Sequence, residues 1–140
     1  MEIDKASLAL EYGLAVNSGG GLPVLDAIGE GPLTMLNLFA LEEEATYPDG
    51  TACTGLEAML RYGATSGERL AAVGGAFITQ ALPTGVVWGE DADWDLLVVA
   101  TYPSALAFWQ LLADPLYREA FVHRRAAVAR QRVTVGVPLS

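Results

Sequence analysis

Residues 94–132 read WDLLVVATYPSALAFWQLLADPLYREAFVHRRAAVARQR and carry the clearest structural pattern of the chain. The uninterrupted apolar run at 96–100 has the length and the residue types of a buried strand. Pro103 ends this run because it has no amide hydrogen for a ladder, and Ser104 is suited to cap a following helix. The Asp-Pro pair at 114–115 predicts a second helix, since aspartate caps helices and proline favours their first position. The stretch therefore predicts a strand, a turn and a broken helix.

Composition restricts the class of protein. The chain has 140 residues, of which 52% are hydrophobic and 18% are charged, and this suits one globular domain with its own core. The net charge of −9 argues against nucleic acid and anionic membranes as partners, because both attract positive surfaces. The acidic N-terminal sequence MEIDK does not resemble a secretory signal, and no apolar run approaches about 20 residues. We therefore expect a soluble, cytoplasmic protein.

Metal or cofactor chemistry has no signature in the sequence. Cys53 is the only cysteine, which suits a reducing compartment, and no companion thiol or histidine accompanies it. The glycine pairs do not match a dinucleotide-binding fingerprint, and no phosphate loop or nucleophile with a nearby base occurs. We expect neither a metal nor a cofactor.

The N-terminal part is expected to be an extension of the main unit. Residues 4–16 predict a helix and residues 22–28 a short helical turn, so residues 1–31 form a partly helical extension too small for its own core. The main domain then spans residues 32–140. All charges from Glu11 to Glu57 are negative, whereas arginines dominate the last helix. Either these are two solvated faces, or the basic helix docks on acidic surface within or between subunits.

The main domain is expected to follow the order β-α-β-β-α-β. Residues 33–40 form a first strand, and a capping-box pattern at Thr54 and Glu57 begins a helix. Residues 76–82 with 86–88 predict an edge strand, interrupted by Pro83-Thr84-Gly85, and residues 133–137 a last strand. The first helix is expected to bend at 65–67 and to bury a stripe composed of Leu56, Met59 or Leu60, Gly63, Gly67, Leu70 and Gly74.

This order predicts an α+β ferredoxin-like sandwich with a four-stranded antiparallel sheet. Right-handed crossovers place the first and third strands at its centre. Two helices cover only one face of such a sheet, but the central strands are apolar on both faces. We therefore expect a homodimer in which two sheets pack face to face as a shared barrel.

The segments PLTMLNLFALEEEATYPDG, GLEAMLRYGA and VGGAFI, together with WDLLVVATYPSALAFWQLLADPLYREAFVHRRAAVA, resemble a known family. It is the uncharacterised family called domain of unknown function 1330, within the dimeric α/β-barrel superfamily, and the resemblance covers roughly residues 32 to 135. The resemblance implies the fold and the dimer. Wider relatives include cofactor-independent monooxygenases, muconolactone isomerases, haem-using enzymes and stress-responsive binding proteins, so it implies little chemistry.

Two polar residues are candidates for catalysis. His123 is the only histidine, and it is a general acid or base at the boundary of helix and sheet or a structural histidine. A role as haem or metal ligand is a third alternative, which the absence of a second ligand at useful spacing disfavours. Asn37 lies in an apolar strand and must be partnered, because an unpaired buried amide costs about 1–3 kcal/mol. It either hydrogen-bonds across the sheet or dimer interface, or presents its amide to a ligand carbonyl.

Aromatic residues and one arginine are candidates for ligand binding. Trp94, Tyr102, Phe39 and Tyr62 suit a flat apolar ligand, although such residues also form ordinary cores. Arg124 pairs with Glu90, Asp91 or Asp93, binds a substrate carboxylate, or lies on the surface. These features favour a homodimeric small-molecule-binding protein, in its enzymatic form a cofactor-independent oxygenase, isomerase or cyclase acting on an aromatic or polyketide-like compound. The alternative is a non-catalytic binding or interaction protein in which His123 is structural.

Overall fold

The computed structural model describes residues 2–14, 22–90 and 92–139. Two N-terminal helices precede a β-α-β-β-α-β unit whose last helical segment is divided in two. The elements are α1 (Lys5–Tyr12), α2 (Leu22–Ile28), β1 (Leu33–Leu41), α3 (Gly55–Ala72), β2 (Ala76–Ala81), β3 (Leu96–Tyr102), α4 (Ala105–Ala113), α5 (Pro115–Ala127) and β4 (Val128–Gly136).

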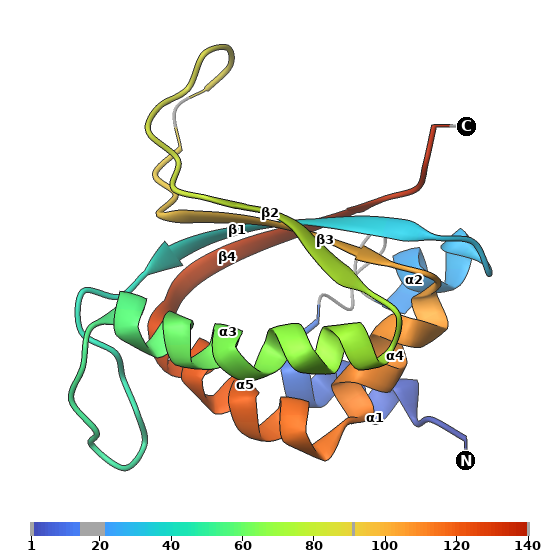
Figure 1. Ribbon diagram of the computed structural model, residues 1–140, viewed down its shortest axis with the longest axis horizontal. Coiled ribbons are helices and arrows are strands. Elements are labelled where there is room, and N and C mark those ends of the chain that lie inside the picture. The colour runs from blue at the N-terminus through green and yellow to red at the C-terminus, as the bar shows by residue number, and fades with distance from the viewer. Residues whose placement is uncertain (1, 15–21, 91, 140) are drawn as a thin grey trace.

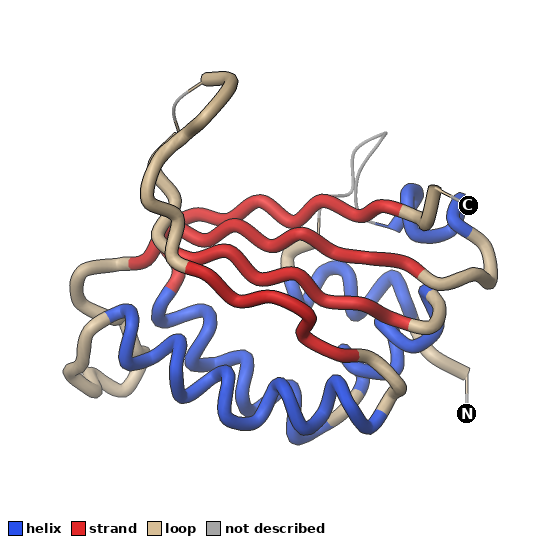
Figure 2. The backbone as a smooth tube through the Cα atoms, turned by 45° about the horizontal axis from the view of Figure 1, so that its top comes forward, coloured by secondary structure: helices blue, strands red, loops and turns tan. Residues whose placement is uncertain are grey.

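The four strands form one antiparallel sheet in the order β2-β3-β1-β4. The two central strands are β1 and β3, as the crossover rule predicts, and Asn37 lies opposite Val98 in their register. Helices α3 and α5 pack against each other beneath one face of the sheet (Figure 1), and the four strands run side by side above them (Figure 2). This is the predicted ferredoxin-like α+β fold.

The two faces of the sheet differ in exposure. On β1, the residues Leu33, Met35, Asn37 and Phe39 are buried toward the helices. The opposite face carries apolar side chains that are only half-buried, among them Leu36, Leu38, Leu97 and Val99. The loop at 82–90 and the C-terminal tail extend away from the helices on the side of this open face (Figure 1). Trp88, in that loop, is 93% exposed.

The predicted break between the last two helices is confirmed. The Ser104 hydroxyl accepts from the amide of Ala107 at 3.1 Å and caps α4. The Asp114 carboxylate accepts from the amide of Leu116 at 2.9 Å, and Pro115 occupies the first position of α5. Both caps follow from local sequence, because each side chain satisfies an amide that the helix leaves free.

Helix α3 differs from the prediction in two respects. It is one continuous helix through 65–67, and Thr54 caps it by accepting from the amide of Glu57 at 3.0 Å. Its buried stripe is also rotated from the predicted one, since Leu56 and Leu60 are 48% and 67% exposed. The buried residues of the helix are Gly55, Ala58, Met59, Tyr62, Ser66 and Leu70.

Two strands differ in length from the prediction. β2 is an edge strand with a register shift between Phe77 and Thr79, but it ends at Ala81, and residues 86–88 belong to a loop. β4 begins at Val128, five residues before the predicted start, because α5 leads directly into the strand. The early start places Gln131 opposite Phe39 of β1.

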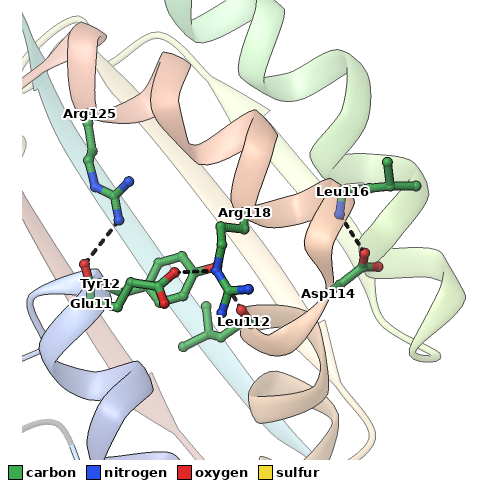
Figure 3. Close-up of polar contacts among 7 residues, drawn as sticks. All are labelled: Glu11, Tyr12, Leu112, Asp114, Leu116, Arg118 and Arg125. Carbon is green, nitrogen blue, oxygen red and sulfur yellow. Dashed lines mark hydrogen bonds and ion pairs between the residues drawn. The ribbon is translucent and has the colours of Figure 1, made fainter. Parts of the chain in front are cut away.

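Helix α1 is fastened to α4 and α5 by polar contacts (Figure 3). The Tyr12 hydroxyl donates to the carbonyl of Leu112 at 2.7 Å, and Arg118 forms an ion pair with Glu11. Arg125 donates to the Glu11 carbonyl at 3.0 Å. The basic helix thus docks on an acidic residue within the same chain, which was one of the two interpretations of the charge pattern.

The helix predicted at 4–16 ends earlier than expected. Gly13 closes α1 in the left-handed conformation, with φ of 69°, which glycine adopts without steric cost. The last two positions of the predicted helix, residues 15 and 16, lie outside the described residues. Within the described part of the chain, every helix is too short or too polar to cross a bilayer.

Candidate functional site

A cavity of about 510 Å³ lies between the sheet and the helices beneath it. All four strands and the helices α1 to α5 contribute residues to its wall. Most of these residues are apolar or aromatic. Arg124 is the one charged residue among the described residues that line the cavity, although the whole protein carries a net charge of −9.

The cavity brings together five of the predicted site residues, which are Asn37, Phe39, Tyr62, Tyr102 and Arg124. These come from β1, α3, β3 and α5, so they meet only in the folded chain. The other two predicted residues, Trp94 and His123, are not among the described residues that line it.

Arg124 projects from α5 into a group of aromatic rings. Its guanidinium carbon lies 4.8 Å from the ring centroid of Phe39, 5.5 Å from that of Tyr62 and 5.1 Å from that of Phe121. Its nitrogens donate to the Tyr62 hydroxyl at 3.1 Å and to the side-chain oxygen of Gln131 at 2.8 and 3.3 Å. The predicted pairing with Glu90 or Asp93 is therefore wrong for these two described residues, and Asp91 lies outside the described part.

Three phenols surround the arginine. The hydroxyls of Tyr62 and Tyr117 lie 2.6 Å apart. Burial raises the pKa of Tyr117 well above its ordinary value, and burial followed by the proximity of Tyr62 raises the pKa of Tyr102. Tyr102 and Tyr117 are therefore neutral at physiological pH and act as hydrogen-bonding groups rather than as bases.

Asn37 is anchored to the sheet. Its amide nitrogen donates to the carbonyl of Val98, its cross-strand neighbour, at 3.1 Å and to the carbonyl of Met35 at 3.4 Å. The predicted hydrogen bond across the sheet is thus present. Because the nitrogen is engaged twice, the amide oxygen Oδ1 is the atom without a hydrogen bond to the described residues.

His123 and Trp94 have partners elsewhere. The Nδ1 atom of His123 lies 2.6 Å from the hydroxyl of Tyr47, in the loop between β1 and α3, and both residues are half-buried. The ring of Trp94 lies 4.3 Å from the Arg130 guanidinium. Both contacts lie apart from the polar group formed by Arg124 and the phenols.

Sequence reasoning did not identify Ser66, Tyr117 and Gln131 as site residues, although all three line the cavity. Tyr117 precedes Phe121 and Arg124 by four and seven residues, so the helical period was a usable signal. Ser66 follows Tyr62 by one turn. Gln131 had no such signal, because its position depends on a strand start that the sequence did not reveal.

Metal-ligating side chains do not gather in the described part of the chain. No group of three or more His, Cys, Asp or Glu residues that could hold a metal ion occurs within residues 2–14, 22–90 and 92–139. What the cavity offers is one cation, neutral phenols, an amide oxygen and aromatic faces. This set suits recognition of a compact ring compound with few polar groups.

Solved structures share the fold. RPA0582, a protein of unknown function from Rhodopseudomonas palustris, is 42% identical, with a TM-score of 0.73 over 79% of this chain and 85% of that one. The structure of the methylated RPA0582 protein is 43% identical, with a TM-score of 0.74 over 79% and 83%. SnoaB, described as a cofactor-independent oxygenase from Streptomyces nogalater, is 17% identical, with a TM-score of 0.51 over 78% of this chain and 94% of that one. A protein from Bacteroides fragilis, described as dimeric, of unknown function and ferredoxin-like, is 12% identical, with a TM-score of 0.50 over 76% and 95%.

A search of curated proteins gives no match. The sequence pattern of the family named Domain of unknown function (DUF1330) matches residues 51–137. This match covers more than half of the chain and includes α3, α5 and three of the four strands. The chain belongs to the DUF1330 family.

Proposed function

We propose that this chain is a homodimeric small-molecule-binding protein whose cavity holds a compact, largely apolar ring compound. The observation that carries the proposal is the cavity of about 510 Å³, lined by aromatic rings with a few polar groups. Ligand sites in proteins typically have volumes of about 300–1,000 Å³ and this kind of wall. Phe39, Tyr62 and Tyr102 supply faces against which a flat ring packs.

The dimer is supported by the open face of the sheet. Leu36, Leu38, Leu97 and Val99 form a contiguous apolar group there, because Leu36 lies opposite Val99 and Leu38 opposite Leu97. A second copy presenting the same face buries these side chains from water. The ferredoxin-like protein from Bacteroides fragilis, which is described as dimeric, supports a dimer in general terms.

Binding without catalysis is the form of the function that the geometry favours. An enzymatic form that begins with removal of a proton, as an oxygenase, isomerase or cyclase of this kind does, needs a base next to the ligand. The phenols of Tyr102 and Tyr117 are held neutral, and His123 bonds Tyr47 rather than facing the cavity. Catalysis by His123, with the amide of Asn37 presented to the ligand, stays a prediction.

The binding proposal is tested with 1-naphthol, a neutral flat probe, by isothermal titration calorimetry. A Val98→Phe variant places a larger side chain in the cavity wall and should abolish binding. The matched control is Ala64→Phe, which adds the same ring on the exposed side of α3 and should leave binding unchanged. Native mass spectrometry of freshly purified protein measures the assembly and any retained molecule in the same preparation.

Two outcomes are decisive for this proposal. Saturable 1-naphthol binding by a dimer, lost in Val98→Phe alone, supports it. Absence of binding to the wild-type protein, together with no retained molecule in the native mass spectrum, contradicts it. The variant His123→Gln then distinguishes binding with catalysis from binding alone. If His123 is structural, the substitution changes the melting temperature but does not remove a reaction of the bound compound.

A further inference from the structure

Among the described residues, the guanidinium of Arg124 has no acidic partner. Arginine carries five N–H donors, and the contacts with Tyr62 and Gln131 use three of them. Every ion pair among the described residues belongs to another cation, namely Lys5, Arg69 or Arg118. Two donors of a part-buried cation therefore remain for a group that the described chain does not supply.

Arg124 also keeps its charge in this position. An arginine guanidinium stays protonated in proteins. Burial lowers the pKa of this one, but the tyrosines around it, among them the hydrogen-bonded Tyr62, together leave that pKa above the ordinary value. Its partners in the cavity are a phenol and a neutral amide. The charge in this part of the cavity is consequently positive, and burying a charge without a counter-charge is unfavourable.

Two further polar atoms in the cavity lack partners. Ser66 is 1% exposed, and its hydroxyl has no hydrogen bond to the described residues. The Oδ1 atom of Asn37 likewise has no hydrogen bond to the described residues, because the two hydrogen bonds of the side chain are donated by its amide nitrogen. Asn37 and Phe39 are next neighbours on one face of β1, which places their Cα atoms about 7 Å apart.

The aromatic rings fix where a ligand would meet the cation. The guanidinium of Arg124 lies over the ring of Phe39. A ligand group bound to Arg124 therefore lies close to Phe39, and Asn37 is the next residue along the same face of β1. A six-membered or fused ring has the length to span this step. A ring compound with an anionic group at one end and a hydroxyl further along would therefore meet Arg124 first and Asn37 next.

From the unpaired guanidinium and the two unpartnered polar atoms, we infer that the cavity selects anionic ring compounds, in the form of small aromatic or cyclic carboxylates. The carboxylate takes the two free donors of Arg124, and the ring packs against Phe39 and Tyr62. A hydroxyl on the ring donates to Asn37 Oδ1. This inference rests on the proposed binding function and adds the charge of its ligand.

The experiment compares two probes of nearly equal shape, 2-naphthoate and 2-naphthamide, by calorimetric titration of the full-length chain at pH 7.5. The carboxylate is expected to bind at least about tenfold more tightly, because hydrogen bonds to charged groups are stronger than neutral ones. Arg124→Met keeps the length of the side chain and removes the charge, and it should bring the two affinities together.

Arg125→Gln is the matched control. Arg125 is the next residue of α5 and also stacks on Phe121, at 4.7 Å, but it is exposed and does not line the main cavity. Its loss should leave the preference for 2-naphthoate intact. If Arg124→Met fails to fold, the comparison of the two probes on the wild-type protein still decides the question.

The possible failures are distinguishable. Equal affinity of the two probes for the wild-type protein, or a preference that survives in Arg124→Met, overturns the inference and leaves the binding function standing. If neither 2-naphthoate nor 2-naphthamide binds while 1-naphthol does, the inference is also overturned and the binding function stands. If 1-naphthol also fails and no molecule is retained, the binding function and this inference fall together.

Discussion

Asp114 shows how one side chain can join three helices. It ends α4, caps α5 and accepts from Arg69 of α3 at 2.6 Å. Burial raises the pKa of its carboxyl group, but the hydrogen bonds from Arg69 and from the Leu116 amide outweigh burial and leave the pKa below the ordinary value. The charged form of Asp114 therefore stabilises the folded state.

Replacing this carboxylate gives a pH-dependent loss of stability. Asp114→Ala removes a cap and an ion pair and should lower the free energy of unfolding by about 1–2 kcal/mol at pH 7. Asp114→Asn keeps a capping oxygen and should lose less. Because the folded pKa lies below the unfolded value of about 4, the advantage of the wild-type protein is complete above that pH.

As pH falls through the folded pKa, the difference between wild type and Asp114→Asn should shrink. Urea unfolding at several pH values between 7 and 3 measures this difference. Glu119→Gln, an exposed change on the same helix, serves as the control and should stay within about 0.5 kcal/mol of wild type. A difference for Asp114→Asn that is constant with pH would contradict the role assigned to its charge.

The caps could be predicted from sequence because their chemistry is local. Ser104 and Asp114 lie within a few residues of the amides that they satisfy. The surroundings of Arg124 could not, since Phe39, Tyr62 and Gln131 reach it from other elements. A side chain with distant partners is identified as a candidate by its type, and only the fold supplies its contacts.

At the scale of single elements, α3 combines a tight contact with an open one. A Cβ atom at Gly55 would lie 2.0 Å from the carbonyl oxygen of Glu42, so the first turn of the helix packs directly on the chain that follows β1. At Gly63 a Cβ atom would meet nothing within 4 Å. The two glycines therefore have opposite roles within one helix.

Alanine at these two positions should change stability in opposite directions. Gly55→Ala forces the helix away from Glu42 and should cost about 1–3 kcal/mol in the free energy of unfolding. Gly63→Ala removes a poor helix former in open space and should gain about 0.5–1 kcal/mol. Urea unfolding of the two single variants provides the comparison. Equal effects of both substitutions would disprove the close contact at Gly55.

The stripe of α3 was mispredicted for a reason related to the site. Hydrophobic spacing favours Leu56 and Leu60 as inward residues, but the helix turns Tyr62 and Ser66 toward the cavity instead. The inner face of α3 therefore carries polar side chains where the helix borders the cavity. A rule that searches for the most apolar stripe consequently selects the wrong side.

At the scale of the whole molecule, the topology was predictable and the assembly is a prediction. The order of strands follows from the sequence of elements and from the handedness of crossovers, which hold for sheets in general. The apolar character of both sheet faces was likewise visible in the sequence of β1. This apolar character of both faces is the reason for predicting a dimer.

A charge on the open face should separate the two copies. Leu97 lies on the open face of the central strand β3, opposite Leu38 of β1 and Ala81 of the edge strand β2. Leu97→Glu should convert a dimer to a monomer in sedimentation velocity experiments, because a dimer would bury the carboxylate without a partner. Leu60→Glu, on the exposed side of α3, is the control and should remain dimeric. A monomeric wild-type protein, or a dimer that tolerates Leu97→Glu, would rule out assembly through this face.

The exposed loop at 82–90 gives the protein an optical property of its own. Trp109 is 1% exposed in the core, whereas Trp88 is 93% exposed in a loop that extends on the side of the open sheet face (Figure 1). Their fluorescence therefore comes from opposite environments, one insensitive to events at the surface and one highly sensitive. A second copy docked on the open face is expected to change the emission of Trp88 and its access to a soluble quencher, against the signals of buried Trp109 and half-buried Trp94. Tryptophan emission is therefore the expected readout of association through this face, without an attached dye.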